Sequence, residues 1–159
     1  MTLATPPLAR IRWSKTYRIV ASRYPPIDLY ENVADPPDWE ALQQLEMLTN
    51  PRVRQEWGDI SLVPVHRRVA GPGATYVMAA FALFDPRGSR FSDGTFGAYY
   101  ASHDLATAIR ETVHHMSAFY ASTNDPPHRE NFRTLLGSID ARLHDIRGDP
   151  AFEPLLDPD

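Results

Sequence analysis

Apolar and polar positions repeat along this chain with two different periods, which together predict both strands and helices. Residues 16–22, TYRIVAS, alternate with a period of two and predict a first strand. Residues 132–146 alternate in part and predict a long strand near the other end. Arg18 alternates with Tyr17 and Ile19, so its side chain should point away from theirs, either into solvent or toward a ligand.

A helical period follows the sequence Asp35-Pro36-Pro37-Asp38, in which an acidic cap and prolines at the first turn are typical of a helix start. This helix should end at Asn50-Pro51. Its predicted buried face consists of Trp39, Leu42, Leu45 and Leu48.

A second helix is predicted from about Ser102, a good N-cap, to about Tyr120. Asp104 in its first turn suits the helix dipole. Glu111 lies off the apolar stripe and shares a face with small and polar residues, which suits either a ligand or a plain solvated surface. The expected buried stripe consists of Leu105, Ile109, Thr112, Val113, Met116 and Tyr120.

Residues 75–84, TYVMAAFALF, form a nearly continuous apolar run that fits a buried strand or part of a helix. The flanking glycines and the Asp-Pro pair favour the strand. Together the elements predict an α+β (mixed α/β) fold in one domain, residues 1–159, with residues 1–12 as an N-terminal arm.

Composition narrows the class of protein. The chain has 159 residues, 43% of them hydrophobic and 23% charged, which is ordinary for a globular domain. Its net charge of −4 argues against nucleic acid as a direct partner. It has no cysteine, no segment of membrane-spanning length and no apolar run that suits a signal peptide, so we expect a cytoplasmic protein without a membrane partner.

The candidate chemistry lies in residues 90–111, RFSDGTFGAYYASHDLATAIRE. Arg90 falls in a predicted loop, Tyr100 near the end of a short predicted strand, and Glu111 on the second helix. A compact turn from strand to helix would bring a cation, a phenol and a carboxylate to one cleft. A register slip of one residue would exchange Tyr99 for Tyr100.

Other motifs are weaker. His114-His115 point about 100° apart on a helix, so they suit one metal ion poorly, and no metal site is expected. His66-Arg67-Arg68 is most simply a solvated basic loop. Ser138 has no base at a motif spacing, and no glycine-rich phosphate loop or nucleophile elbow occurs.

The segments Gly88-Ser89-Arg90-Phe91, Tyr99-Tyr100-Ala101 and Ala108-Ile109-Arg110-Glu111, in that order, resemble the RES domain, the toxin of bacterial toxin–antitoxin pairs. Tyr17-Arg18-Ile19 resembles the first strand of that family. The resemblance runs from about residue 16 to residue 146.

This resemblance implies an ADP-ribosyltransferase-like fold, with a central split β-sheet flanked by short helices, and a type II toxin that cleaves the nicotinamide–ribose bond of NAD+. NAD+ would be the substrate, with no tightly bound cofactor. Glu111, Arg90 and Tyr100 would be catalytic, and Arg90, Tyr100 and Arg18 would bind NAD+. The implied partner is an Xre-like antitoxin with a helix-turn-helix part, and the toxin could form a homo- or hetero-oligomer.

Two alternatives remain open within this resemblance. The acceptor of the ADP-ribose group could be water or phosphate. It could instead be a target protein, which would make the chain a protein ADP-ribosyltransferase. The family's serine belongs to a later segment, which this chain does not contain, and the last strand or strands of the family are expected to be absent. The chain could therefore instead be a catalytically incomplete module that binds the antitoxin.

Overall fold

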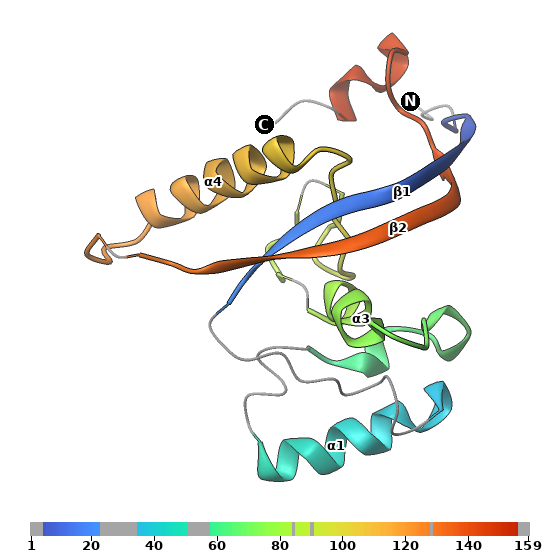
Figure 1. Ribbon diagram of the computed structural model, residues 1–159, viewed down its shortest axis with the longest axis vertical. Helices are drawn as coiled ribbons and strands as arrows, with labels where there is room; N and C mark the ends of the chain where they lie inside the picture. Colours follow the sequence, from blue (N-terminus) through green and yellow to red (C-terminus); the bar gives the residue numbers. More distant parts are fainter. Residues whose placement is uncertain are drawn as a thin grey trace. The chain divides into compact units, whose positions relative to one another are not determined.

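The computed structural model describes residues 5–22, 35–50, 58–83, 85–89, 91–127 and 129–155 (Figure 1). The chain divides into two compact units, which are described separately. The first comprises Met1–Arg23 and Ala101–Asp159, and the second comprises Tyr24–Tyr100. Both helices and strands are present, as predicted, and none of the described helices has the length and apolar character needed to span a bilayer.

The first unit is built on an antiparallel pair of long strands, β1 (Leu8–Ala21) and β2 (Phe132–His144) (Figure 1). The register runs from Leu8 opposite His144 to Ala21 opposite Phe132, with an irregularity between Trp13 and Thr16. Both predicted strands are confirmed. β1 begins earlier than the predicted strand, because Leu8 to Arg12, expected in an arm, pair with β2.

Helix α4 (Leu105–Ala121) confirms the second predicted helix and contacts β1. Its buried side differs from the predicted stripe. Ala108 is 5% exposed, and Thr112, Met116 and Tyr120 continue that side as half-buried residues.

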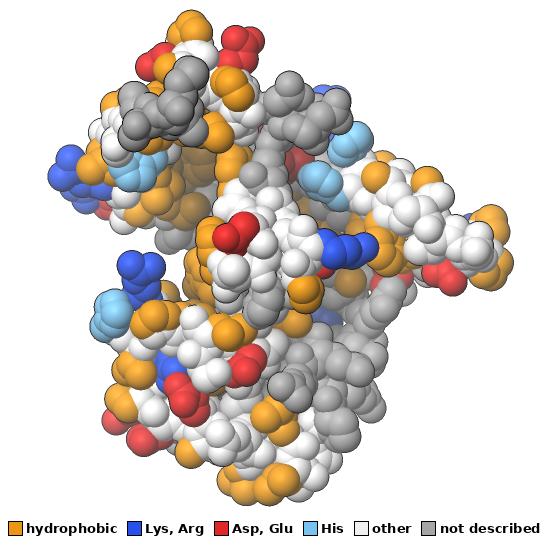
Figure 2. Space-filling model, turned by 180° about the vertical axis from the view of Figure 1, so that it is seen from behind, with side chains coloured by type: hydrophobic (Ala, Val, Ile, Leu, Met, Phe, Trp, Pro, Cys, Tyr) orange, Lys and Arg blue, Asp and Glu red, His pale blue; other side chains and the backbone are white. Residues whose placement is uncertain are grey.

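The other members of the predicted stripe, Leu105, Ile109 and Val113, are exposed, with Val113 at 58%. A sheet of two strands presents a narrow surface, so it can cover only part of a helix. The small Ala108 side chain lies on the side that is covered. Apolar side chains are accordingly visible at the molecular surface in Figure 2.

The start of α4 also differs from the prediction. The helix begins after Asp104, which is its N-cap, in place of Ser102. The Asp104 carboxylate accepts hydrogen bonds from the Thr107 amide (2.8 Å) and the Thr107 hydroxyl (3.1 Å). These two bonds, the amide first, lower the pKa of Asp104 because they stabilise its charged form.

The short strand predicted to end near Tyr100 is not formed. The described residues contain one sheet of two strands, and the remaining pairing near this segment is the isolated bridge between Tyr17 and Ser102. A short aromatic run has strand propensity, but it becomes a strand only where a partner edge is available. The split sheet of an ADP-ribosyltransferase-like fold stays a prediction.

The second unit has its own hydrophobic core, which consists of Trp39, Ile60, Val63, Ala74 and Met78. Trp39 belongs to α1 (Trp39–Thr49), which follows the short 3-10 turn η1 (Pro36–Asp38) as the prolines predicted. Leu42 packs against this core, whereas Leu45 and Leu48 are exposed, which corrects half of the predicted buried face.

The apolar run that predicts a strand instead belongs, over residues 75–82, to helix α3 (Ala74–Ala82). The prediction was wrong because an apolar run buried on several sides has no diagnostic period. Ala74, Ala79, Ala80 and Ala82 favour the helix, since alanine has the highest helix propensity. The helix satisfies its own backbone hydrogen bonds, so this segment needs no partner strand.

The remaining described elements are three short 3-10 turns. Two of them, η2 (Ile60–Leu62) and η3 (Val65–Arg67), lie in the second unit. The third, η4 (Pro150–Leu155), lies in the first unit and buries Phe152 almost completely.

Arg68 corrects the expectation that residues 66–68 form a solvated loop, because its side chain is only 1% exposed. The guanidinium donates to the carbonyl oxygens of Val63 (2.9 Å), Ile60 (3.2 Å) and Pro36 (2.8 Å), and it pairs with Glu40. One arginine therefore joins three segments of the second unit around its core. Its planar fork of donors suits this arrangement.

We expect Arg68→Met to lower the free energy of unfolding by about 3 kcal/mol, because it leaves buried carbonyl groups without donors. Denaturant unfolding of the purified chain would measure this loss. Arg67→Met is the matched control, since Arg67 is exposed, and it should change stability by less than about 0.5 kcal/mol. Equal stability of the two variants would contradict the structural role of Arg68.

We expect the Asp104 pKa to move back toward the usual range for aspartate in Thr107→Val, which removes one donor and keeps the Thr107 amide. The folded-state pKa is lowered, so the charged cap stabilises α4 above the usual aspartate pKa, and this stabilisation is lost as the pH falls through the lowered value. An NMR titration of the Asp104 carboxyl carbon would measure the shift. Thr112→Val, which removes a hydroxyl bonded to the Ala108 carbonyl instead, should leave this titration unchanged.

Candidate active site

Glu111 lies on α4 with its side chain exposed. The Ser102 hydroxyl donates a hydrogen bond to Glu111 Oε2 at 3.2 Å. Ser102 is itself fixed to β1, because its amide donates to the Tyr17 carbonyl (2.9 Å) and its carbonyl accepts from the Tyr17 amide (2.8 Å). The carboxylate is therefore accessible to a ligand and is also connected to the strand pair.

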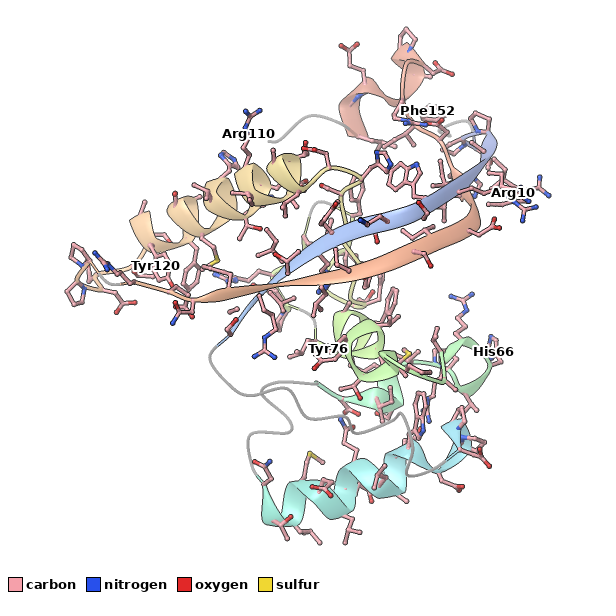
Figure 3. All side chains as sticks on the ribbon, in the orientation of Figure 1. Arg10, His66, Tyr76, Arg110, Tyr120 and Phe152 are labelled. Carbon is pink, nitrogen blue, oxygen red and sulfur yellow. The ribbon has the colours of Figure 1, made fainter. Side chains whose placement is uncertain are left out.

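The neighbouring Arg110 also projects from α4 (Figure 3). At the far end of the helix, the Tyr120 hydroxyl donates to Glu130 Oε2 at 2.9 Å. This contact joins the last turn of α4 to the segment that leads into β2. The helix that carries Glu111 is thus tied to the rest of the first unit near both ends.

Tyr100 lies at the end of the second unit, 41% exposed. Its hydroxyl is 3.0 Å from the Ser89 hydroxyl, and its ring stacks on Phe91 with centroids 6.4 Å apart and planes at 29°. Tyr99 instead stacks on Phe81, which packs against the hydrophobic core. The two adjacent tyrosines therefore differ in their surroundings, and Tyr100 is the more accessible to a ligand.

Tyr100 borders a shallow hollow of about 100 Å³. Gly94 in the loop beside it has φ +87°, and a Cβ there would lie 2.4 Å from the Pro86 carbonyl oxygen. At Gly97 the constraint is close approach, since a Cβ would lie 2.3 Å from the Ala80 oxygen of α3. The hollow is lined by Leu83, Asp85, Gly88, Ser89, Ser92, Phe96, Gly97, Ala98 and Tyr100.

An ion pair between Arg87 and Asp85 lies at this hollow. The Arg87 side chain donates to both oxygens of Asp85, at 3.0 and 2.6 Å, and with the Arg87 amide it lowers the pKa of Asp85 to about 2. Asp85 is therefore ionised throughout the physiological range and is no candidate for a general acid.

Arg90 lies outside the described residues. The residues on either side of it in the loop, Ser89 and Ser92, pair through two backbone hydrogen bonds of 2.7 and 3.1 Å. Arg18 lies on β1 opposite Leu135 and is half-buried. Arg18 and Glu111 belong to the first unit and Tyr100 to the second. That these four residues form one site stays a prediction.

The histidine pair and Ser138 lack the partners that a metal site or a nucleophile needs among the described residues. His114 and His115 are both exposed on α4, with ring centroids 5.5 Å apart. Within the described ranges, no group of three or more histidine and acidic side chains could hold a metal ion. Ser138 is exposed on β2.

Sequence reasoning did not identify the contact that Ser102 makes with Glu111. A serine before a helix is a strong capping signal, so the sequence predicts Ser102 as the cap. Asp104, two residues later, carries the same signal. Only the path of the loop decides which side chain caps the helix and which is left to contact Glu111.

No solved structure matches this chain. The uncharacterized protein y4oC of Sinorhizobium fredii is 32% identical to it over 135 residues. That match covers 84% of this chain and 57% of the relative, so the chain spans a little over half of that protein's length.

The family model described as the RES domain matches residues 64–159. This range contains three of the predicted site residues, Arg90, Tyr100 and Glu111. The matched range is more than half of the chain, and the alignment with the relative, at 32% identity, covers most of the remaining residues. The chain belongs to the RES domain family.

Proposed function

We propose that this protein is the toxin of a type II toxin–antitoxin system and that it acts on NAD+ by cleaving the nicotinamide–ribose bond. Its membership of the RES domain family, a toxin family, supports the proposal. The observation that carries the chemistry is the accessible Glu111 carboxylate, which is held through Ser102 beside the strand pair.

The reaction explains why a carboxylate is needed. Nicotinamide leaves NAD+ as a neutral molecule, and the ribose carbon that loses it acquires oxocarbenium character. A carboxylate near the ribose stabilises this developing positive charge, and it can also accept a hydrogen bond from the ribose 2′-hydroxyl. In this proposal Glu111 takes both roles.

The other site residues bind the nucleotide. A guanidinium matches the pyrophosphate oxygens with paired, charge-assisted hydrogen bonds, and this role falls to Arg90 with Arg18. An aromatic ring stacks on nicotinamide and holds it twisted, and this role falls to Tyr100. The stacking of Tyr100 on Phe91 restrains the orientation of the Tyr100 ring, which is partly exposed.

The acceptor of the ADP-ribose group separates two versions of the proposal. Transfer to water or phosphate makes the protein an NAD+ glycohydrolase or phosphorylase, which is the version we favour. Transfer to a side chain makes it a protein ADP-ribosyltransferase. Incubation with NAD+ labelled in its ADP-ribose portion and with cell lysate distinguishes them: label on a protein band indicates transfer, and label only in small products indicates degradation.

The proposal extends to partners and fold. RES domain proteins generally pair with an antitoxin, and we propose an Xre-like antitoxin with a helix-turn-helix part. We also propose an ADP-ribosyltransferase-like domain with NAD+ as substrate and no tightly bound cofactor. A chain that binds such an antitoxin tightly but does not consume NAD+ would instead be a binding module.

We expect Glu111→Gln to abolish NAD+ consumption while the protein stays folded, because the side chain is exposed and the amide carries no charge to stabilise the ribose cation. Glu153→Gln makes the same chemical change at an exposed position on η4 and should leave turnover unchanged. Nicotinamide release, measured by chromatography, is the assay. Full turnover by Glu111→Gln would remove this carboxylate from the mechanism.

We expect Arg90→Ala to raise KM for NAD+ about 30-fold, since a charge-assisted contact of roughly 2 kcal/mol is lost. Steady-state kinetics measures the change. Arg87→Ala, in the same loop, is the control and should leave KM within about twofold, because Arg87 already pairs with Asp85. An unaltered KM in Arg90→Ala would assign Arg90 a structural role instead.

A further inference from the structure

We propose that Ser102 is a positioning residue, whose hydroxyl holds the Glu111 carboxylate in the orientation used for bond cleavage. This inference rests on the proposed function and adds to it a residue outside the predicted site. It starts from the hydrogen bond of 3.2 Å between Ser102 Oγ and Glu111 Oε2.

The hydroxyl is available for this role because another residue caps the helix. Asp104 receives the amide and hydroxyl of Thr107, so the start of α4 is satisfied without Ser102. A serine used as a cap would direct its hydroxyl toward the first-turn amides of the helix. Here the Ser102 hydroxyl instead reaches a carboxylate nine residues later in the sequence.

The backbone of Ser102 supplies a rigid base for the contact. Two hydrogen bonds to Tyr17 fix it against β1, and Ser102 is half-buried. Glu111, by contrast, is an exposed side chain on a helix surface and would otherwise sample several rotamers. A fixed donor therefore selects among the orientations of a flexible acceptor.

The geometry also assigns different roles to the two oxygens of the Glu111 carboxylate. Ser102 engages Oε2, so the proposal leaves Oε1 to face the ribose. At 3.2 Å the bond is longer than the usual O–H···O distance. It should therefore contribute little to folding stability at an exposed site, and its main effect should be on the reactive orientation.

The test uses Ser102→Ala, Ser102→Thr and the control Ser117→Ala, which removes an exposed hydroxyl from α4, the helix that carries Glu111. We expect Ser102→Ala to lower kcat for NAD+ cleavage about tenfold with KM changed less than about twofold, as expected for the loss of one orienting hydrogen bond. Ser102→Thr keeps the hydroxyl and suits extended backbone, so it should restore most of kcat. Ser117→Ala should match the wild type.

A second measurement does not depend on activity. Three-bond NMR couplings of Glu111 report its χ1 rotamer populations, and we expect one dominant rotamer in the wild type and in Ser102→Thr, but averaging in Ser102→Ala. Identical populations in all variants would overturn the positioning role. So would an unaltered kcat in Ser102→Ala, or a Ser102→Thr variant no better than Ser102→Ala.

The two proposals fail in different ways. A wild-type protein that folds and does not consume NAD+ would refute the proposed function, while the NMR measurement would still decide whether Ser102 orients Glu111. A wild-type protein that consumes NAD+, with Ser102→Ala equally active, would refute the positioning role and leave the proposed function in place.

Discussion

The antiparallel pairing of β1 with β2 is the interaction on which the first unit depends. Its innermost pair, Ala21 opposite Phe132, closes roughly 110 residues of chain, which by loop-closure scaling costs about 4 kcal/mol. Many backbone hydrogen bonds along two strands of this length offset the cost. They are supported by Asp140, which receives both Arg10 Nε (2.8 Å) and Arg10 Nη2 (3.0 Å). Once formed, the strand pair gives α4 a surface on which to pack.

The candidate carboxylate owes its setting to the same strand pair. Ser102 is held to β1 by two backbone hydrogen bonds with Tyr17. Its hydroxyl in turn donates a hydrogen bond to Glu111. α4 contacts β1, and its buried side is marked by Ala108, whereas Glu111 lies on an exposed side of the helix. A narrow sheet thus accounts both for the exposed apolar residues of the helix and for the accessibility of the acid.

The second unit is organised around a different constraint, the burial of a charged group. Arg68 donates to three backbone carbonyls and pairs with Glu40. These interactions offset the free-energy cost of removing a guanidinium from water. The buried Gln43 side chain also binds backbone groups of this unit: it donates to the Gly58 carbonyl and accepts from the Ile60 amide, at 3.0 Å each. The unit therefore combines a small apolar core with polar side chains that bind its irregular backbone. Tyr100 and the hollow beside it lie at the end of this unit.

The sequence by itself predicted the second half of β1, most of β2, helix α1, the presence of helix α4 and the family, because periodicity, caps and short motifs are local properties of the chain. It also indicated Glu111, Tyr100, Arg90 and Arg18 as candidates from residue type and order. Only the tertiary structure decided that residues 74–82 are helical, which side of α4 is covered, that Arg68 is buried, and that Asp104 caps the helix while Ser102 contacts Glu111. Each of these depends on a partner distant in sequence or on the path of a loop, and hydrophobic patterning records that a residue prefers burial without recording what buries it.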